Sequence, residues 1–345
     1  MDELGSAAPE GGNGAVQRPR LEDVAARVGL STASVSLVLR GVPGPSRNTR
    51  QRVLKAAAEL GYRPDRTASA LASKRSRLLG VMIDIHNAFQ GELVEHLHTA
   101  AEQVGYDLVL STQTRTRDEN TAIDTLLAYR CEALILIGPV APVPFLADLD
   151  RKAPVISVGR RVVGAGLDVV RSADDDGVGQ IVDHLAGLGH RAIVYVDGGK
   201  GAIATDRRRG YRSAMRQHGL DERIRILHGD LTEEAGDKAG RQLLDGGELP
   251  TAVVTFNDRS AIGMLTALWR AGVDVPGEVS VVGYDDSPLS RLTCFDLTTV
   301  SQNAEEQARQ AVLAAVERLD HGRTEPREIV LAPSLVVRGT TAQPR

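Results

Sequence analysis

The sequence is poor in aromatic residues and in cysteine, and it has no long apolar run. Phe, Trp and Tyr together make up 3% of the 345 residues, and the two cysteines are Cys131 and Cys294. This pair offers neither metal-like spacing nor a disulfide framework, so we expect both to be reduced packing residues. The absence of a run of about 18 apolar residues argues against a membrane-spanning helix.

The leader, residues 1–19, lacks the basic start and apolar core of a secretory signal peptide. We therefore expect a cytoplasmic protein. The leader is rich in Gly and Pro, and we expect it to be disordered, with no role that can be read from it. Hydrophobic residues at 42% and charged residues at 25% are ordinary globular values, and the length suggests two or three domains of roughly 150 residues each.

Charge is unevenly distributed along the chain. Residues 18–77 contain thirteen basic and four acidic side chains, a net charge of +9, whereas the remainder carries −13. A basic head on an acidic body indicates that the head contacts a polyanion such as nucleic acid. Charge alone equally fits a solvated basic face.

The head contains a pattern of two short helices joined by a tight turn. Their inner faces carry seven apolar residues, namely Leu21, Val24, Ala25, Val28, Val35, Val38 and Leu39. Gly29 ends the first helix, and Ser31 is a good N-cap for the second. The spacing of Leu21, Ala25, Gly29 and Val35 is that of a helix-turn-helix, in which a small residue permits close crossing and glycine adopts the turn. A generic helical hairpin is the alternative.

A third helix is predicted from Thr49 to Leu60, with Asn48 or Thr49 as its cap and Gly61 after its end. Five of its residues would complete a three-helix core, namely Val53, Leu54, Ala57, Ala58 and Leu60.

The wider string RLEDVAARVGLSTASVSLVLRG, followed by TRQRVLKAAAELGYRPDRTASALASKRS, resembles the headpiece and hinge of the lactose-repressor (LacI/GalR) family. With the body described below, the resemblance covers about residues 20–340. It implies a homodimeric, sequence-specific transcriptional regulator, most often a repressor, that binds double-stranded operator DNA without a cofactor. The implied domains are a headpiece (20–64), a hinge (65–77) and an effector-binding and dimerisation domain (78–345).

In that family the second helix enters the major groove of DNA. The resemblance assigns contacts with bases to Thr32, Ala33 and Leu37. It assigns contacts with phosphates to Ser31, Ser34, Ser36 and Asn48. An arginine, the usual reader of guanine, is common in the family where this chain has Leu37, so we expect a different operator.

The hinge of the family folds when two copies meet in the minor groove, where a leucine wedges into a base step. The resemblance assigns this wedge to Leu71, and Ala68 would allow the two hinges to approach. Asp65 stands where asparagine is usual, and a carboxylate near phosphate would weaken hinge folding. A plain linker is the alternative.

From Leu78 onward, short apolar runs alternate with amphipathic helical segments. The predicted strands are 78–84, 106–112, 132–138, 153–159, 192–198, 251–257 and 279–285. The predicted helices are 92–104, 121–129, 178–188, 206–217, 233–244, 260–271 and 305–319. This α/β alternation predicts parallel sheets in two lobes, a periplasmic-binding-protein-like core, with the chain crossing near 170–174 and returning near 298–303.

Polar residues follow the predicted strands, where ligands of such folds bind. The resemblance assigns the effector site to Phe89, Arg207, Asn257, Asp258, Asp285 and Gln302. Carboxylates with an arginine can grip hydroxyls, and an aromatic face can cover a sugar ring, so we predict a carbohydrate-like effector that controls operator affinity. Arg207 equally suits a ligand carboxylate or phosphate. Strand-end capping and salt bridges between the lobes are the alternative.

Three positions depart from the family in this domain. Gly159 replaces a frequent aspartate before Arg160, Ala88 replaces a frequent proline, and 294–296 (Cys-Phe-Asp) replaces the usual Pro-Pro. The first change removes an acceptor for a hydroxyl, so a common hexose is not assumed.

A solute-binding protein and an enzyme are the two alternative classes of function. The body alone fits a solute-binding protein, but the basic head and the lack of a signal peptide disfavour this. An enzyme would need a nucleophile–base or metal motif, and we predict no catalytic residue and no metal site.

The chain lacks a heptad tail, so we expect a dimer whose seam includes the helix at 92–104.

Overall fold

The computed structural model describes residues 19–39, 42–62 and 75–345. The chain divides into two compact units, Met1–Ser76 and Arg77–Arg345. The predictions for the leader and for Asp65, Ala68 and Leu71 of the hinge fall outside the described residues.

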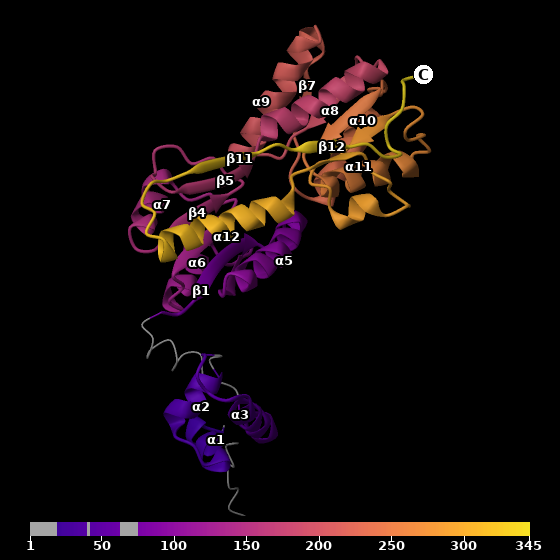
Figure 1. Ribbon diagram of the computed structural model, residues 1–345. Coiled ribbons are helices and arrows are strands. Elements are labelled where there is room, and N and C mark those ends of the chain that lie inside the picture. The colour runs from indigo at the N-terminus through magenta and orange to yellow at the C-terminus, as the bar shows by residue number, and fades with distance from the viewer. Residues whose placement is uncertain (1–18, 40–41, 63–74) are drawn as a thin grey trace, which may run out of the picture. The chain divides into compact units, whose positions relative to one another are not determined.

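The first unit contains three helices, α1 (Leu21–Val28), α2 (Thr32–Leu39) and α3 (Arg47–Leu60) (Figure 1). Gly29 closes α1 with a left-handed φ of 66°, and the hydroxyl of Ser31 accepts the backbone N–H of Ser34 at 3.2 Å. The core between the helices consists of Val24, Ala25, Val28, Val35, Val38, Val53, Ala56 and Ala57. Because these side chains are small, the three helices can pack closely.

The third helix differs from its prediction in its start and in its buried face. It begins at Arg47, and the hydroxyl of Ser46 caps it by accepting the N–H of Thr49, so the predicted caps Asn48 and Thr49 are wrong. Leu54 is 49% exposed and Ala58 is also exposed, whereas Ala56 is buried. The helical period explains the correction, since Val53, Ala56, Ala57 and Leu60 share one face.

The second unit begins with a lobe built on a six-stranded parallel sheet of order β11-β5-β4-β3-β1-β2. Its strands are β1 (Leu78–Asp84), β2 (Asp107–Gln113), β3 (Ala133–Ile137), β4 (Val155–Val158), β5 (Asp168–Ser172) and β11 (Glu328–Leu331). Helices α5 (Ala88–Gln103) and α12 (Ala304–Asp320) cover one face. Helices α6 (Glu119–Ala128) and α7 (Val143–Asp150) cover the other.

The second lobe has a four-stranded parallel sheet of order β7-β6-β8-β9. Its strands are β6 (Ile193–Val196), β7 (Arg225–Leu227), β8 (Ala252–Thr255) and β9 (Ser280–Val282). Helices α8 (Asp174–Leu188) and α9 (Ala202–Gln217) cover one face, and α10 (Glu233–Asp245) and α11 (Asp258–Arg270) cover the other. Two short 3-10 turns, η1 (Asp221–Arg223) and η2 (Pro288–Arg291), complete the lobe.

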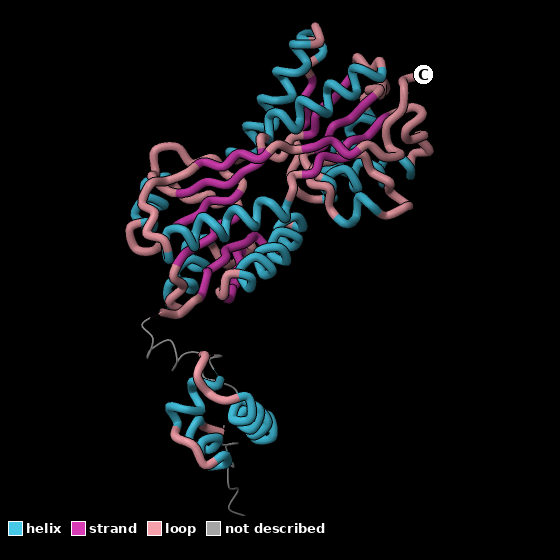
Figure 2. Tube along the Cα trace, viewed as in Figure 1, coloured by secondary structure: helices cyan, strands magenta, loops and turns pink. Residues whose placement is uncertain are grey.

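The chain passes between the lobes three times (Figure 2). It leaves the first lobe between β5 and α8 and returns between β10 (Thr299–Ser301) and α12. A third passage, which the sequence did not indicate, lies between β11 in the first lobe and β12 (Ser334–Val336), which pairs antiparallel with β10. Within the bounds of β11 and β12 the apolar runs are only three and two residues long, too short for periodicity to identify a strand.

No helix within the described ranges is long and apolar enough to span a membrane.

Candidate functional site

Helix α2 presents its predicted DNA-contacting residues on the side away from the core. Thr32, Ala33 and Leu37 are exposed, with Leu37 at 36%, whereas Val35 and Val38 are buried. Of the residues assigned to phosphate, Ser31 and Asn48 are exposed, and Ser34 and Ser36 are partly buried. The exposed face of α2 therefore offers hydroxyl and methyl groups, and the basic side chains of the unit lie outside this helix.

In the second lobe, Arg207 of α9 is the centre of a buried polar cluster. It is 3% exposed, its Nε donates to Oδ1 of Asp174 at 2.7 Å, and its Nη1 donates to the carbonyl of Phe256 at 2.6 Å. Its Nη2 lies 3.7 Å from Oδ1 of Asp285. The guanidinium is thus paired with two carboxylates supplied by different segments.

Two aromatic rings enclose the same guanidinium. Its central carbon lies 3.6 Å from the ring centroid of Tyr284 and 4.6 Å from that of Phe256. Burial by itself lowers the pKa of Arg207, but the carboxylate of Asp174 and the other nearby groups raise it above its usual value. Arg207 therefore remains charged, held by cation–π contacts and ion pairs.

Asp285 lies between Arg207 and Gln302. Its Oδ1 accepts Nε2 of Gln302 at 2.7 Å, and the backbone at Asp285 has a φ of 115°, a conformation that side chains rarely adopt. Burial raises the pKa of Asp285 to about 8, against the opposing effect of Arg207 and with a further increase from Asp258. Burial therefore favours the protonated form of this carboxyl, which can donate a hydrogen bond as well as accept one.

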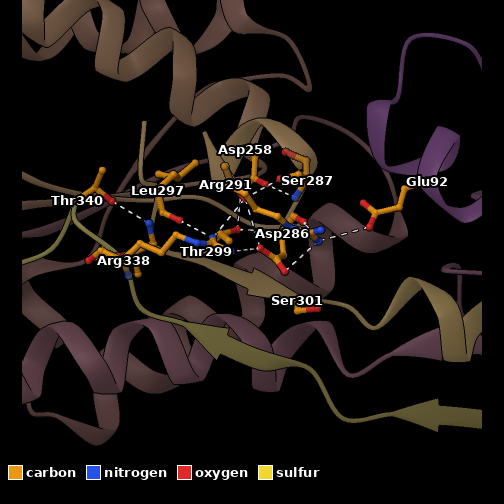
Figure 3. Close-up of polar contacts among 12 residues, drawn as sticks. Glu92, Asp258, Asp286, Ser287, Arg291, Leu297, Thr299, Ser301, Arg338 and Thr340 are labelled. Atoms are coloured by element: carbon orange, nitrogen blue, oxygen red, sulfur yellow. Dashed lines mark hydrogen bonds and ion pairs between the residues drawn. The ribbon is translucent and has the colours of Figure 1, made fainter. Parts of the chain in front are cut away.

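Asp258 and Asn257 make their contacts within the protein. The carboxylate of Asp258 accepts the hydroxyl of Thr299 at 2.6 Å and the N–H of Ser287 at 2.7 Å, and burial raises its pKa to about 6 (Figure 3). Asn257 caps α11 through Ser260. These contacts fix the ends of β8, β9 and β10 relative to one another.

The structure therefore brings Arg207, Asp285 and Gln302 into one cluster, with Asp258 next to it. Phe89 lies in the first lobe, in the apolar core cluster of α5 and α12, at 9% exposed. Its role as a ring-covering residue stays a prediction.

Sequence reasoning missed Asp174, the carboxylate that Arg207 bonds directly. Asp174 is the first residue of α8 and is 3% exposed. An acidic residue in the first turn of a helix is common, because it favours the helix dipole, so the Asp-Asp-Asp run carried no signal of function. Tyr284 and Phe256 were missed as ring partners for a different reason. They belong to apolar strand runs, where an aromatic residue is expected to pack in the core.

Two arginines of the second lobe contact the start of α5 and the preceding loop in the first lobe. Nη2 of Arg291 lies 3.5 Å from Oε1 of Glu92 and also donates to the carbonyl of Asp286 at 2.8 Å (Figure 3). Arg259 donates to the carbonyl of His86. These contacts join the lobes next to the segment that carries Asp285.

In the first lobe, a buried acid and an arginine hold the loop after β3. Oε2 of Glu119 accepts the N–H groups of Val140 at 2.8 Å and Ala141 at 3.0 Å. Nη1 of Arg160 donates to the carbonyls of Pro139 at 3.0 Å and Ala141 at 2.7 Å. Arg160, although it follows a strand, is therefore occupied with main-chain groups.

Within the part of the chain that the structure describes, no group of three or more His, Cys, Asp or Glu side chains is arranged to hold a metal ion.

A small helix-turn-helix unit and a two-lobed α/β unit with polar residues at its strand ends define a helix-turn-helix regulator with a periplasmic-binding-protein-like domain. Residues 20–65 match the model of the bacterial regulatory proteins of the lacI family, and residues 182–341 match the periplasmic binding protein-like domain. The chain belongs to the lacI family, and it is a DNA-binding transcriptional regulator.

Relatives and solved structures agree over nearly the whole chain. The HTH-type transcriptional regulator GalR of Escherichia coli K12 is 31% identical over 329 residues, 94% of this chain and 96% of GalR. The lac repressor dimer bound to operator and the anti-inducer ONPF has a TM-score of 0.81 at 29% identity, over 94% of this chain and 100% of that one. The CelR–cellobiose complex has a TM-score of 0.69 at 29% identity, again over 94% and 100%. These relatives are transcriptional regulators rather than enzymes.

Proposed function

We propose that the chain is a repressor whose affinity for an operator is controlled by a small carbohydrate-like ligand bound between the two lobes. The observation that carries this proposal is the cluster of Arg207, Asp285 and Gln302 at the strand ends of the second lobe. The CelR complex with cellobiose and the lac repressor complex with operator support it by similarity.

The DNA half of the proposal rests on the exposed face of α2. Thr32, Ala33 and Leu37 would contact bases, and Ser31, Ser34, Ser36 and Asn48 would contact phosphates. A homodimer would place two such helices on two half-sites. In this proposal the headpiece is residues 20–64 and the hinge is residues 65–77, with Ala68 and Leu71 in the minor groove. The effector domain is residues 78–345, and the leader, residues 1–19, belongs to none of these domains.

The ligand half rests on the chemistry of the cluster. Asp285 and Gln302 offer acceptors and donors for hydroxyl groups, and Phe89, Asn257 and Asp258 are the other proposed effector residues. A ligand can shift operator affinity only through different affinity for two arrangements of the protein. The contacts of Arg291 with Glu92 and of Arg259 with His86 join the lobes, so they would change when the lobes move.

The first experiment selects genomic fragments with the purified protein, with and without a panel of sugars and sugar phosphates. Salt is held fixed because phosphate contacts make affinity salt-dependent. We expect a tight palindromic site that one ligand releases. If no fragment binds better than random DNA under any condition, the proposal fails.

Two variants and one control variant separate the halves of the proposal. Asp285→Asn should abolish the ligand response and keep operator binding, whereas Asp175→Asn, which removes a carboxylate that pairs with Arg209, should keep both. Leu71→Ala should weaken operator binding more than binding to random DNA. Equal losses on both DNAs would remove the wedge from the proposal.

We further propose that the chain acts without catalysis or a cofactor, in the cytoplasm, where an operator would lie. Turnover of a panel sugar that Asp285→Asn abolishes would contradict the first part.

A further inference from the structure

Arg207 is the basic group at the centre of the ligand cluster, and two of its three side-chain nitrogens already make hydrogen bonds within the protein. Nε donates to Asp174 at 2.7 Å and Nη1 donates to the carbonyl of Phe256 at 2.6 Å. The rings of Tyr284 and Phe256 lie against the guanidinium. An arginine clamps a ligand carboxylate or phosphate through two parallel N–H groups, from Nε and Nη2 or from Nη1 and Nη2. Nη2 lies 3.7 Å from Oδ1 of Asp285, but each pair includes a nitrogen that is already bonded, so a ligand anion held in this way would have to displace Asp174 or the carbonyl of Phe256.

Charge near Arg207 is also unfavourable for an anion. Asp174 makes a hydrogen-bonded ion pair with the guanidinium, and Asp285 and Asp258 add two further buried carboxyl groups. Even when Asp285 is protonated, Asp174 alone balances Arg207, so no net positive charge remains for a ligand. Burying one more negative group there would cost free energy, because a charge is stable in the interior only when it is paired.

The neighbouring arginines of the lobe are paired in the same way. Arg208 donates to Asp197 at 2.5 Å, and Nε of Arg259 donates to Glu233 at 2.7 Å. A neutral hydroxyl group meets none of these obstacles, because it can accept from Gln302 and can donate to, or accept from, Asp285.

We propose that this site selects neutral polyhydroxylated ligands against anionic ones, and that Asp174 is the specificity-determining residue because it withholds the Arg207 guanidinium from ligand anions. The inference rests on the proposed function, since it concerns the same ligand site. It answers the question that the residue types left open, whether Arg207 serves a carboxylate or phosphate.

The test uses full-length protein and inorganic phosphate as the probe, titrated by calorimetry with sodium chloride balancing the ionic strength. We expect no saturable phosphate binding by the wild type. Asp174→Asn should gain saturable binding at least about tenfold tighter than any residual wild-type signal, equivalent to about 1.4 kcal/mol. The double variant Asp174→Asn with Arg207→Gln should lose that gain, because the released charge is then absent.

Asp175→Asn is the matched control. It removes the same charge from the same turn of α8, but Asp175 pairs with the exposed Arg209 at 2.9 Å. We expect no gain of phosphate binding. An equal gain in Asp175→Asn, or no gain in a folded Asp174→Asn protein, would overturn the proposal.

A second arm uses the wild type alone and is independent of how any variant folds. Neutral sugars and their phosphate esters are compared in pairs by thermal shift. Stabilisation by a neutral sugar and not by its ester supports the proposal, and stabilisation by esters alone overturns it. The operator experiment above reads DNA binding separately, so a failed operator search and a failed charge preference are distinguishable.

Discussion

The two lobes place a buried acid and an arginine near the ends of their strands, but they connect them differently. In the first lobe, Glu119 and Arg160 both bond main-chain groups of the loop after β3. In the second lobe, Arg207 bonds the side chain of Asp174 and lies near that of Asp285. Side chains tied to the backbone hold one loop in one shape. Charged side chains that bond each other form a network whose electrostatic free energy changes with every added charge or proton.

The largest expected effect is that of Arg207→Met in the second lobe. It leaves Asp174 buried without its cation, so the free energy of unfolding should fall by about 3–5 kcal/mol at neutral pH. Urea denaturation followed by circular dichroism measures this. The loss should shrink in acid, where the carboxyl groups take up protons. A loss as small as that of the matched variant in the first lobe would remove the distinction between the lobes.

That matched variant is Arg160→Met. It removes two charge-assisted hydrogen bonds to the carbonyls of Pro139 and Ala141, so we expect a loss of about 2 kcal/mol. Amide hydrogen exchange should show faster exchange confined to Val140 and Ala141. Faster exchange throughout the lobe would mean that Arg160 supports more than its loop.

The pH dependence of stability should come from the second lobe through Asp285. Burial raises its pKa to about 8 in the folded protein, so the folded carboxyl keeps a proton that the unfolded chain releases. The free energy of unfolding should therefore fall as pH rises from the usual carboxyl range toward about 8, with a slope of up to about 1.4 kcal/mol per pH unit.

In urea titrations at a series of pH values, Asp285→Asn should remove this slope between about pH 6 and about pH 8, above the raised pKa of Asp258. Asp175 provides the opposite case: burial raises its pKa, but the hydrogen bond and charge of Arg209, together with backbone hydrogen bonds, lower it on balance. Its contribution is present above the unfolded pKa and is lost as pH falls. An unchanged slope in Asp285→Asn would show that another group is responsible.

The smallest expected effect is that of Glu119→Gln. The amide oxygen can still accept the N–H groups of Val140 and Ala141, so we expect a loss of about 1 kcal/mol or less by the same denaturation. A loss that approaches the Arg207→Met value would mean that the charge of Glu119, and not its geometry, holds the loop.

Much of this architecture could be predicted from periodicity. The seven apolar runs contain β1, β3, β4, β6, β8 and β9, and all of β2 except its last residue, Gln113. Val and Ile runs between helical segments are typical of buried parallel strands. Strand β5 was missed because Asp168 and Arg171 interrupt its pattern. Asp168 is 1% exposed, and its charge is paired with Arg323, which lies far away in the sequence.

The cluster was only partly predictable. Family resemblance named Arg207, Asp285 and Gln302, which α9 and the segments after β9 and β10 bring together. The partnership of Asp174 with Arg207 could not be read, since no local spacing encodes a contact between two residues that lie 33 positions apart on different helices. The capping of α3 by Ser46 was a nearer miss, since serine is as good a cap as asparagine.

The third passage between the lobes has a consequence for the order of synthesis. Helix α12 and strand β11 belong to the first lobe but lie after the whole four-stranded sheet of the second lobe in the chain. During translation, α1, α2 and α3 leave the ribosome first and can fold as a unit, whereas the first lobe waits for its last helix and edge strand. A chain interrupted before Ala304 would therefore retain the three helices of the headpiece but lack a completed first lobe.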